Sequence, residues 1–428
     1  MSGDNGPEND LRGTPLGLYK RGRGSNVLRT GLLQSDTPDP DTRHGLHPDH
    51  RPRLSHPLSG ANLATLLRAL ATSGGVARER LPQAAVALGA ALGRFPFTTA
   101  ERLYVAATLG RNPKIQPPIF IIGHWRSGTT HLYNVMSRGG FGFVDPLAAG
   151  LPWDLLGLVP LLRPWLERAL PHDRFIDSIP VMPDSPQEDE LALANMTTLS
   201  YYHGLYFPKR FPEAFYRGLF FDGCGPDEIA AWQRRFRMFL AKLSHARNGQ
   251  RLLIKNPVYT ARVAMLHDMY PGAKFIHIHR NPHQIFASMR NFYDKLFAEL
   301  ALQRTGNLDI DSVILATFSR MMDRLLEEAP RLPGGAFVEL AYDDLVADPL
   351  ASLAEIYRRL DLPDFEAAKP SFESYLAGVR GYRTNIYGDS DDAAALVERH
   401  WGRYLGIWGY QRPVGTSRRP GRHTMATR

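Results

Sequence analysis

The sequence predicts an α/β fold in which helices cover both faces of a central parallel sheet. The first observation is a set of short, continuously apolar runs, such as Ile119–Ile122, bounded by Pro, Gly or charged residues. Such runs are typical of strands that are buried on both sides, as they are in parallel sheets. The second observation is that helical stretches separate these runs along the chain, which is the order of elements in parallel α/β sheets.

The expected elements follow one another in a clear order. Residues 63–109 have a helical pattern of apolar clusters, and a Pro-rich break at 113–118 ends that region. Strands are expected at 119–122, 251–254, 274–279 and 336–340, because each is a short apolar run. Helices are expected at 130–136, 232–246 and 314–328, so strands and helices alternate.

Composition divides the chain into four regions. Residues 1–60 are rich in Gly, Pro, Asp, Arg and His without apolar periodicity, and we expect a disordered arm. Residues 61–116 form a helical extension and 117–411 the main domain. Within that domain, 147–226 is richer in Pro and aromatic residues, which is typical of an insertion that shapes a binding site. Residues 412–428 form a basic tail that we expect to be disordered.

Charge and cysteine content limit the class of protein. The 428 residues carry a formal net charge of +8, but five arginines and no acid lie in 412–428. The rest of the chain is only mildly basic, which argues against a nucleic-acid-binding protein. A solvated tail is the simpler interpretation, although a peripheral membrane contact through it stays open. The single cysteine, Cys224, fits a reducing compartment, and we expect a cytoplasmic protein.

Membrane and metal signals are weak in this sequence. Residues 1–7 lack the pattern of a signal peptide, and no apolar run reaches about 18 residues, so no transmembrane segment is expected. Cys and His residues do not cluster at metal-ligand spacing, so no metal site is expected either.

The strongest motif is a glycine-framed loop between the first strand and the following helix. Such a loop directs backbone N–H groups and the helix dipole at one spot, and so favours an anion. Gly123, Gly128 and Thr130 match the glycines and hydroxyl of the P-loop, but Thr129 occupies the position of its lysine. Arg126 supplies a cation inside the loop. The sequence therefore predicts a P-loop-like nucleotide site that differs from that of a kinase.

The loop resembles the 5′-phosphosulfate loop of sulfotransferases that use 3′-phosphoadenosine 5′-phosphosulfate (PAPS). Three motifs carry the resemblance: G-H-W-R-S-G-T-T at 123–130, P-Q-E-D-E at 186–190 and K-N-P at 255–257. They are similar to those of a bacterial group related to tyrosylprotein sulfotransferases, and the resemblance covers 117–410. It implies PAPS as co-substrate, PAP as product and an acceptor hydroxyl. The implied PAPS-binding residues are Arg126, Ser127, Gly128, Thr129, Thr130, Arg280, Ser288 and Tyr342.

The resemblance also assigns roles beyond the loop. Arg280 follows the strand at 274–279, and Ser288 lies eight residues later, as do the residues that hold the 3′-phosphate in the family. Lys255 is similar to the family lysine that meets the bridging oxygen as the bond to sulfur breaks. Tyr342 begins a segment similar to Y-E-x-L, from which this chain departs at Asp343.

Three residues are candidates for the base that accepts the proton of the acceptor hydroxyl. Glu188 is the first choice and Glu190 the second, because related enzymes use a glutamate in this region. A carboxylate at a helix start is also commonplace, since the helix dipole favours it. His124 is the third candidate because an unperturbed histidine has a pKa near ~6.5.

The expected function is therefore transfer of a sulfuryl group from PAPS to a hydroxyl by in-line displacement. The acceptor is not identified by the sequence and can be a small molecule, lipid, sugar or peptide. Two alternatives are a P-loop-type kinase or nucleotidase and a non-catalytic nucleotide-binding protein. Thr129 in place of the lysine weighs against the first, and Lys255 with the acidic cluster weighs against the second.

Overall fold

The structure is a computed structural model that describes residues 55–110, 113–168, 182–379 and 390–413. Most of the arm predicted at 1–60 and of the tail predicted at 412–428 therefore lies outside the described residues. Residues 57–60, which the sequence assigned to the arm, form the 3-10 helix η1 (Pro57–Gly60). Leu58 in this turn is fully buried, because it packs into the main core.

The centre of the fold is a parallel sheet whose strands run in the order β2-β1-β3-β4. The strands are β1 (Ile119–Ile122), β2 (Leu253–Lys255), β3 (Lys274–His279) and β4 (Phe337–Ala341). Ile121 of β1 is in register with Lys255 of β2 and with Ile276 of β3. This topology confirms the α/β fold with a parallel sheet.

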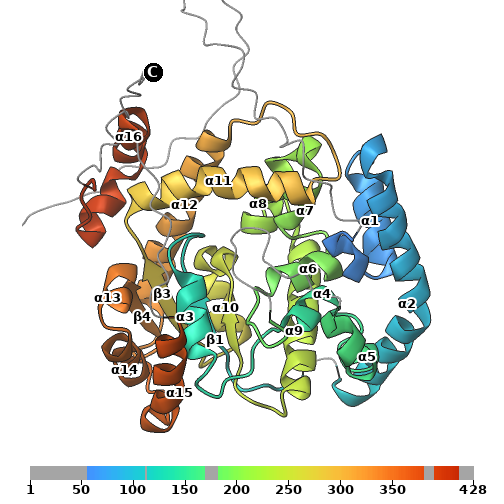
Figure 1. Ribbon diagram of the computed structural model, residues 1–428, viewed down its shortest axis with the longest axis horizontal. Coiled ribbons are helices and arrows are strands. Elements are labelled where there is room, and N and C mark those ends of the chain that lie inside the picture. Colours follow the sequence, from blue (N-terminus) through green and yellow to red (C-terminus); the bar gives the residue numbers. More distant parts are fainter. Residues whose placement is uncertain (1–54, 111–112, 169–181, 380–389, 414–428) are drawn as a thin grey trace, which may run out of the picture. The chain divides into compact units, whose positions relative to one another are not determined.

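Helices cover both faces of the sheet, as predicted (Figure 1). Phe120 and Phe275 point to one face and join the core formed with α9 (Pro226–Ala246), α11 (Pro282–Leu300) and α12 (Ile310–Glu328). Ile121 and Ile276 point to the other face and pack against α3 (Thr129–Met136), α14 (Pro349–Arg359) and α15 (Phe365–Gly378). Because side chains alternate along a strand, one short apolar run supplies both cores.

The remaining helices surround this sheet. Their bounds are α1 (Leu63–Thr72), η2 (Arg78–Arg80), α2 (Leu81–Thr108), α4 (Pro146–Gly150), α5 (Leu158–Arg168), α6 (Glu190–Met196), α7 (Tyr202–Tyr206), η3 (Pro208–Arg210), α8 (Glu213–Phe220), η4 (Pro257–Ala261), α10 (Val263–Met269), η5 (Ala329–Arg331), α13 (Tyr342–Ala347) and α16 (Asp391–Trp408). No helix within the described residues is both long and apolar enough to cross a membrane.

The helical extension is divided into two helices. Asn62 begins α1 by accepting a hydrogen bond from the Thr65 amide at 2.9 Å, which satisfies one free N–H of the first turn. Gly74 and Gly75, both with positive φ, follow α1 and separate it from η2 and α2. Helices α4 to α8 lie within the predicted insertion at 147–226, apart from the first residue of α4, and residues 169–181 are outside the described part.

Candidate active site

Each of the four strands ends in a residue or loop of the candidate site. The loop 123–128 follows β1, Lys255 is the last residue of β2, Arg280 follows β3 and Tyr342 follows β4. The carboxyl ends of parallel strands lie at one edge of the sheet, where ligands of open α/β folds bind. Residues that are far apart in the sequence therefore meet at this edge.

The loop has a backbone conformation that positions it for an anion. Gly123, Arg126 and Gly128 have φ angles of 145°, 68° and 101°. Gly128 is the N-cap of α3, so the loop leads directly to the free N–H groups of that helix. Ser127 Oγ is buried and has no hydrogen-bond partner among the described residues, which fits a donor to a ligand oxygen.

Tyr342 connects the loop with Arg280. A Cβ atom on Gly128 would lie 2.1 Å from Tyr342 Cδ2, so the tyrosine ring packs directly on the Gly128 backbone. The Arg280 guanidinium lies over the same ring, 4.6 Å from its centroid. Arg280 Nε also donates to Gln284 Oε1 at 2.7 Å. The ring thus fixes the spacing between the loop and Arg280.

Two guanidinium groups converge on this region. Arg126 Nε donates to Ser288 Oγ at 2.8 Å, which brings together two residues that the sequence assigned to separate phosphate contacts. Burial lowers the pKa of Arg280, and the nearby positive charge of Arg126 lowers it further. An anion would offset the repulsion between these two positive charges, so the pair is suited to a phosphate-bearing ligand.

Lys255 lies between the loop helix and the acidic segment. Its side chain is only 1% exposed, and Nζ lies 2.5 Å from Glu188 Oε1. Nζ also donates to Thr130 Oγ1 at 3.3 Å. The side chain of Glu188 is 20% exposed, so it forms the solvent-accessible end of this chain of contacts. A lysine and a glutamate are thus placed beside the anion loop.

Glu190 and Asp189 have different surroundings from Glu188, because both are fully buried. Asn256 Nδ2 donates to Asp189 Oδ1 at 2.9 Å and to Glu190 Oε2 at 2.8 Å, and the Tyr259 hydroxyl donates to Asp189. Burial raises the pKa of Asp189 to about 8 and also raises that of Glu190. These contacts hold the segment that presents Glu188. No role was predicted from the sequence for Asn256 or Tyr259, which follow Lys255 by one and four residues, and this position was the available signal.

His124 is enclosed by the core. Its side chain is 1% exposed, Nδ1 lies 2.9 Å from the Trp125 carbonyl oxygen, and its ring packs 5.1 Å from that of Phe318. Burial lowers the pKa of His124 to about 4, so the ring is neutral at neutral pH. A group enclosed in this way is poorly placed to accept a proton from a substrate.

The edge of the sheet therefore carries most of the residues that the sequence singled out. The loop residues, Lys255, Arg280, Ser288 and Tyr342 are linked by contacts, and Glu188 joins them through Lys255. Glu190 and His124 are buried behind this group. Within the described residues, no group of three or more His, Cys, Asp or Glu side chains is arranged to hold a metal ion.

These features define an α/β protein with a P-loop-like anion site. Comparison with known proteins specifies the family. A model described as "Sulfotransferase family" matches residues 117–367, which is more than half of the chain. The chain belongs to this family and is a sulfotransferase.

Two curated relatives support this assignment. Omega-hydroxy-beta-dihydromenaquinone-9 sulfotransferase Stf3 from Mycobacterium bovis is 32% identical over 301 residues, which cover 69% of this chain and 76% of the relative. The protein of the same name from Mycobacterium tuberculosis matches with the same identity and coverage.

Solved structures support the fold. Sulfotransferase STF9 from Mycobacterium avium has a TM-score of 0.61 and 18% identity, and the match covers 82% of this chain and 91% of that one. Sulfotransferase STF1 from Mycobacterium tuberculosis has a TM-score of 0.53 and 20% identity, and the match covers 79% and 91%.

Proposed function

We propose that the protein transfers the sulfuryl group of PAPS to a hydroxyl group. One observation carries this proposal: Lys255 contacts both Thr130, at the start of the anion-loop helix, and Glu188, the partly exposed member of the acidic segment. A group transferred from a nucleotide held by the loop would therefore pass beside a cation and a carboxylate. This is the arrangement needed to stabilise a leaving oxygen and to accept a proton.

The 5′-phosphosulfate is expected to bind the loop 126–130, where backbone N–H groups, Ser127 and Arg126 provide donors. The 3′-phosphate is expected to bind Arg280 and Ser288. Arg126 already contacts Ser288, so both anionic groups would lie within reach of one continuous set of donors. No lysine is present in the loop, and the sulfuryl group carries less negative charge than a phosphoryl group.

The reaction is an in-line displacement at sulfur. The acceptor oxygen forms a bond to sulfur while the bond between sulfur and the bridging phosphate oxygen breaks. Glu188 takes the hydroxyl proton, and Lys255 stabilises the charge that develops on the bridging oxygen, so PAP leaves with its electron pair. In the structure Lys255 Nζ lies 2.5 Å from Glu188 Oε1. When PAPS binds, the ammonium group would turn from this contact toward the bridging oxygen.

Glu188 is the proposed base among the three candidates. Its side chain is partly exposed, whereas Glu190 is held by Asn256 and His124 is held against Trp125 in the core. A base must reach the substrate proton within about 3 Å, and burial keeps the other two from doing so. Glu190 would instead help to position the segment that carries Glu188.

A lipid hydroxyl is the acceptor class to test first. The Stf3 relatives are named for a hydroxylated dihydromenaquinone, and the match to them covers 69% of this chain. We extend that acceptor class, a hydroxyl at the end of an apolar chain, to this protein as a proposal. The other acceptors considered from the sequence, a sugar, a peptide or a small molecule, serve as comparison substrates.

Isothermal titration calorimetry tests the proposal. PAP should bind without added metal, and ATP with magnesium should not compete at matched concentration. Affinity that appears only with magnesium and ATP would instead support the kinase or nucleotidase alternative. Binding of PAP without any transfer to the lipid, sugar and peptide acceptors would support a non-catalytic nucleotide-binding protein.

A further inference from the structure

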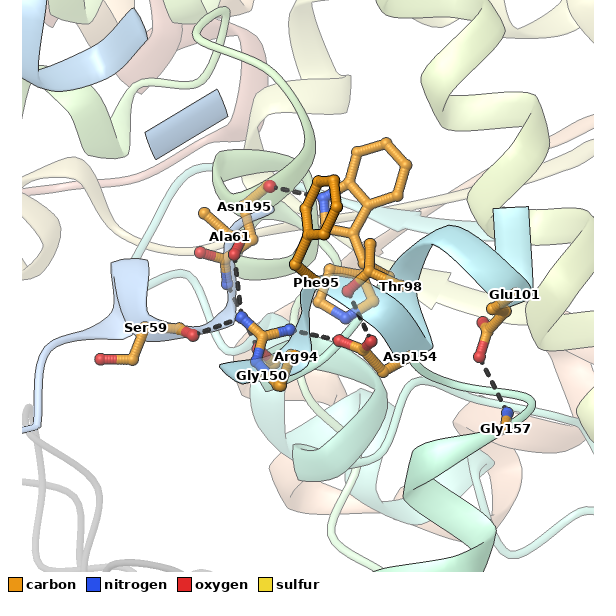
Figure 2. Close-up of polar contacts among 12 residues, drawn as sticks. Ser59, Ala61, Arg94, Phe95, Thr98, Glu101, Gly150, Asp154, Gly157 and Asn195 are labelled. Carbon is orange, nitrogen blue, oxygen red and sulfur yellow. Dashed lines mark hydrogen bonds and ion pairs between the residues drawn. The ribbon is translucent and has the colours of Figure 1, made fainter. Parts of the chain in front are cut away.

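Helix α2 directs several polar side chains, among them Arg94, Thr98 and Glu101, into the protein, although an ordinary surface helix turns such residues to solvent. Figure 2 shows Arg94 between Asp154 and the chain near η1. Arg94 Nη2 donates to the carbonyl oxygens of Ser59 at 2.6 Å and Ala61 at 2.8 Å. Thr98 Oγ1 donates to Asp154 Oδ1 at 2.7 Å. The buried face of α2 is thus fixed by hydrogen bonds.

Glu101, one turn further along α2, also points into the protein. Glu101 accepts a hydrogen bond from the amide of Gly157 at 2.8 Å (Figure 2) and another from the amide of Leu156 at 3.0 Å. It also forms an ion pair with Lys242 at 2.5 Å, in which both side chains are almost fully buried. These bonds fix the rotation of α2 about its axis, so its outward face is equally fixed.

The outward face of α2 is apolar along most of its length. Of the charged residues in this 28-residue helix, Arg94 and Glu101 face inward and Arg102 is exposed. The helix is about 42 Å long at ~1.5 Å per residue. The large exposed apolar side chains on it are Leu81, Val86, Leu92, Phe95, Phe97, Leu103 and Tyr104, and we call them the α2 face. Leu103 is 69% exposed.

Neighbouring helices add further exposed apolar side chains. Leu67 lies on α1, which packs against α2. Trp165 and Leu161 lie on α5, which begins immediately after Gly157, the residue held by Glu101. Trp165 is 64% exposed. Exposed apolar side chains that gather on neighbouring elements are typical of an interaction site, and Trp and Tyr rings are enriched at membrane interfaces.

A group of arginines lies beside the α2 face. Burial lowers the pKa of Arg235, and the positive charges of Arg102, Arg234 and Arg68 lower it further, so each of these three arginines lies near enough to act on Arg235. They come from α1, α2 and α9. Arg102 and Arg235 also lie over the ring of Trp153, at 5.9 Å and 5.0 Å. Residues 63–108 contain five arginines but only two glutamates, so this part of the chain is basic.

We propose that the α2 face binds the surface of an anionic lipid membrane. The apolar side chains would enter the boundary between headgroups and acyl chains, and the arginines would contact lipid phosphates. A contact between two copies of this face would bring two arginine groups toward each other, whereas anionic lipids neutralise them. The proposal depends neither on the donor nor on the acceptor. It differs from a membrane contact through the basic tail because it uses helices within the described fold.

Vesicle co-sedimentation of the full-length protein tests the proposal. Vesicles of phosphatidylglycerol and phosphatidylcholine in equal parts are compared with vesicles of phosphatidylcholine alone. Leu92→Glu with Leu103→Glu places two charges on the α2 face and should weaken binding to anionic vesicles by ~10-fold or more. Ile407→Glu on α16 is the matched control, because Ile407 is also exposed, and it should bind as the wild type does.

Three further measurements complete the test. Arg68→Ala with Arg234→Ala should reduce binding to anionic vesicles by about tenfold and leave the weak binding to phosphatidylcholine unchanged. A variant that ends at residue 413 should bind normally. Circular dichroism melting should give unchanged melting temperatures for all variants, because the substituted side chains are exposed.

The proposal is wrong if wild-type protein does not bind anionic vesicles, or if the α2-face variant binds as tightly as the Ile407→Glu control. Loss of binding only on removal of 414–428 would assign the contact to the tail and overturn the proposal. A concentration-dependent dimer that the α2-face variant abolishes, without vesicle binding by the wild type, would assign the face to a second copy. The affinity of each variant for PAP should be unchanged. Titration with PAP therefore distinguishes failure of the membrane proposal from failure of the proposed function.

Discussion

Gly128→Ala should disturb both ends of the nucleotide site through Tyr342. The new Cβ would lie 2.1 Å from Tyr342 Cδ2, and carbon atoms pack at about 3.5–4 Å, so the ring must move by about 1.5 Å. Overpacking of this kind costs about 1–3 kcal/mol. A left-handed φ, here 101°, adds about 1–2 kcal/mol for alanine. We therefore expect the free energy of unfolding to fall by about 2–5 kcal/mol.

The same substitution should also weaken PAP binding. The Tyr342 ring supports the Arg280 guanidinium at 4.6 Å, so movement of the ring displaces Arg280. Loss of one charge-assisted contact is worth about 1.5–3 kcal/mol, which corresponds to a tenfold or greater loss of affinity. Urea unfolding gives the stability change, and calorimetry with PAP gives the change in affinity.

Gly140→Ala is the matched control for this experiment. Gly140 has a φ of 80°, and a Cβ there would meet nothing within 4 Å, so the substitution adds backbone strain without a clash. It should cost about 1–2 kcal/mol and leave PAP affinity unchanged. In a Tyr342→Ala background, the cost of Gly128→Ala should fall to that of the control. If Gly128→Ala costs no more than Gly140→Ala in the wild type, the packing of the loop on Tyr342 is not as described.

Three other predictions concern charge. Arg126→Ala and Arg280→Ala should each weaken metal-free PAP binding tenfold or more in calorimetry, and an unchanged affinity would remove that residue from the site. Lys255→Met should lower kcat by about 100-fold with little change in the KM for PAPS, as initial rates will show, because the lysine acts on the leaving oxygen. Burial lowers the pKa of His56 and His124 from 6.5 to about 4. Between about pH 4 and pH 6.5 the unfolded chain therefore binds more protons at these histidines than the folded protein does. Each should make the protein about 2 kcal/mol less stable at ~pH 5 than at ~pH 7, and urea unfolding of His56→Gln should show a smaller pH effect than the wild type.

The sequence predicted the sheet well because each strand is a short apolar run whose position can be recognised from the local sequence alone. The bounds of β1 and β3 agree with the expected 119–122 and 274–279, since Pro, Gly or charged residues mark their ends. The strand expected at 251–254 is found at Leu253–Lys255, so the expectation began two residues too early and ended one residue too early. Lys255 belongs to β2 and pairs with Ile121. A lysine can occupy a buried strand position here because Thr130 and Glu188 bind its ammonium group.

The long-range contacts of the site could not be read from the sequence. Nothing in the local pattern relates Arg126 to Ser288, 162 residues away, or Asn256 to Asp189. The orientation of α2 was equally hidden, because its apolar residues fit a buried helix as well as an exposed one. The partners of Arg94, Thr98 and Glu101 in the structure show which face is inside. Tertiary contacts decide such cases, and periodicity alone does not.

Transfer of radiolabelled sulfate from PAPS most directly tests the central claim, that this site moves a sulfuryl group with Lys255 and Glu188. The purified protein is incubated with labelled PAPS and a hydroxylated isoprenoid quinone, and labelled sulfate ester and PAP are measured together. We predict equal amounts of both products from the wild type. Glu188→Gln should bind PAP with unchanged affinity but transfer about 100-fold more slowly. PAP release without a sulfate ester on this or the other acceptor classes, or transfer by Glu188→Gln at the wild-type rate, would contradict the account.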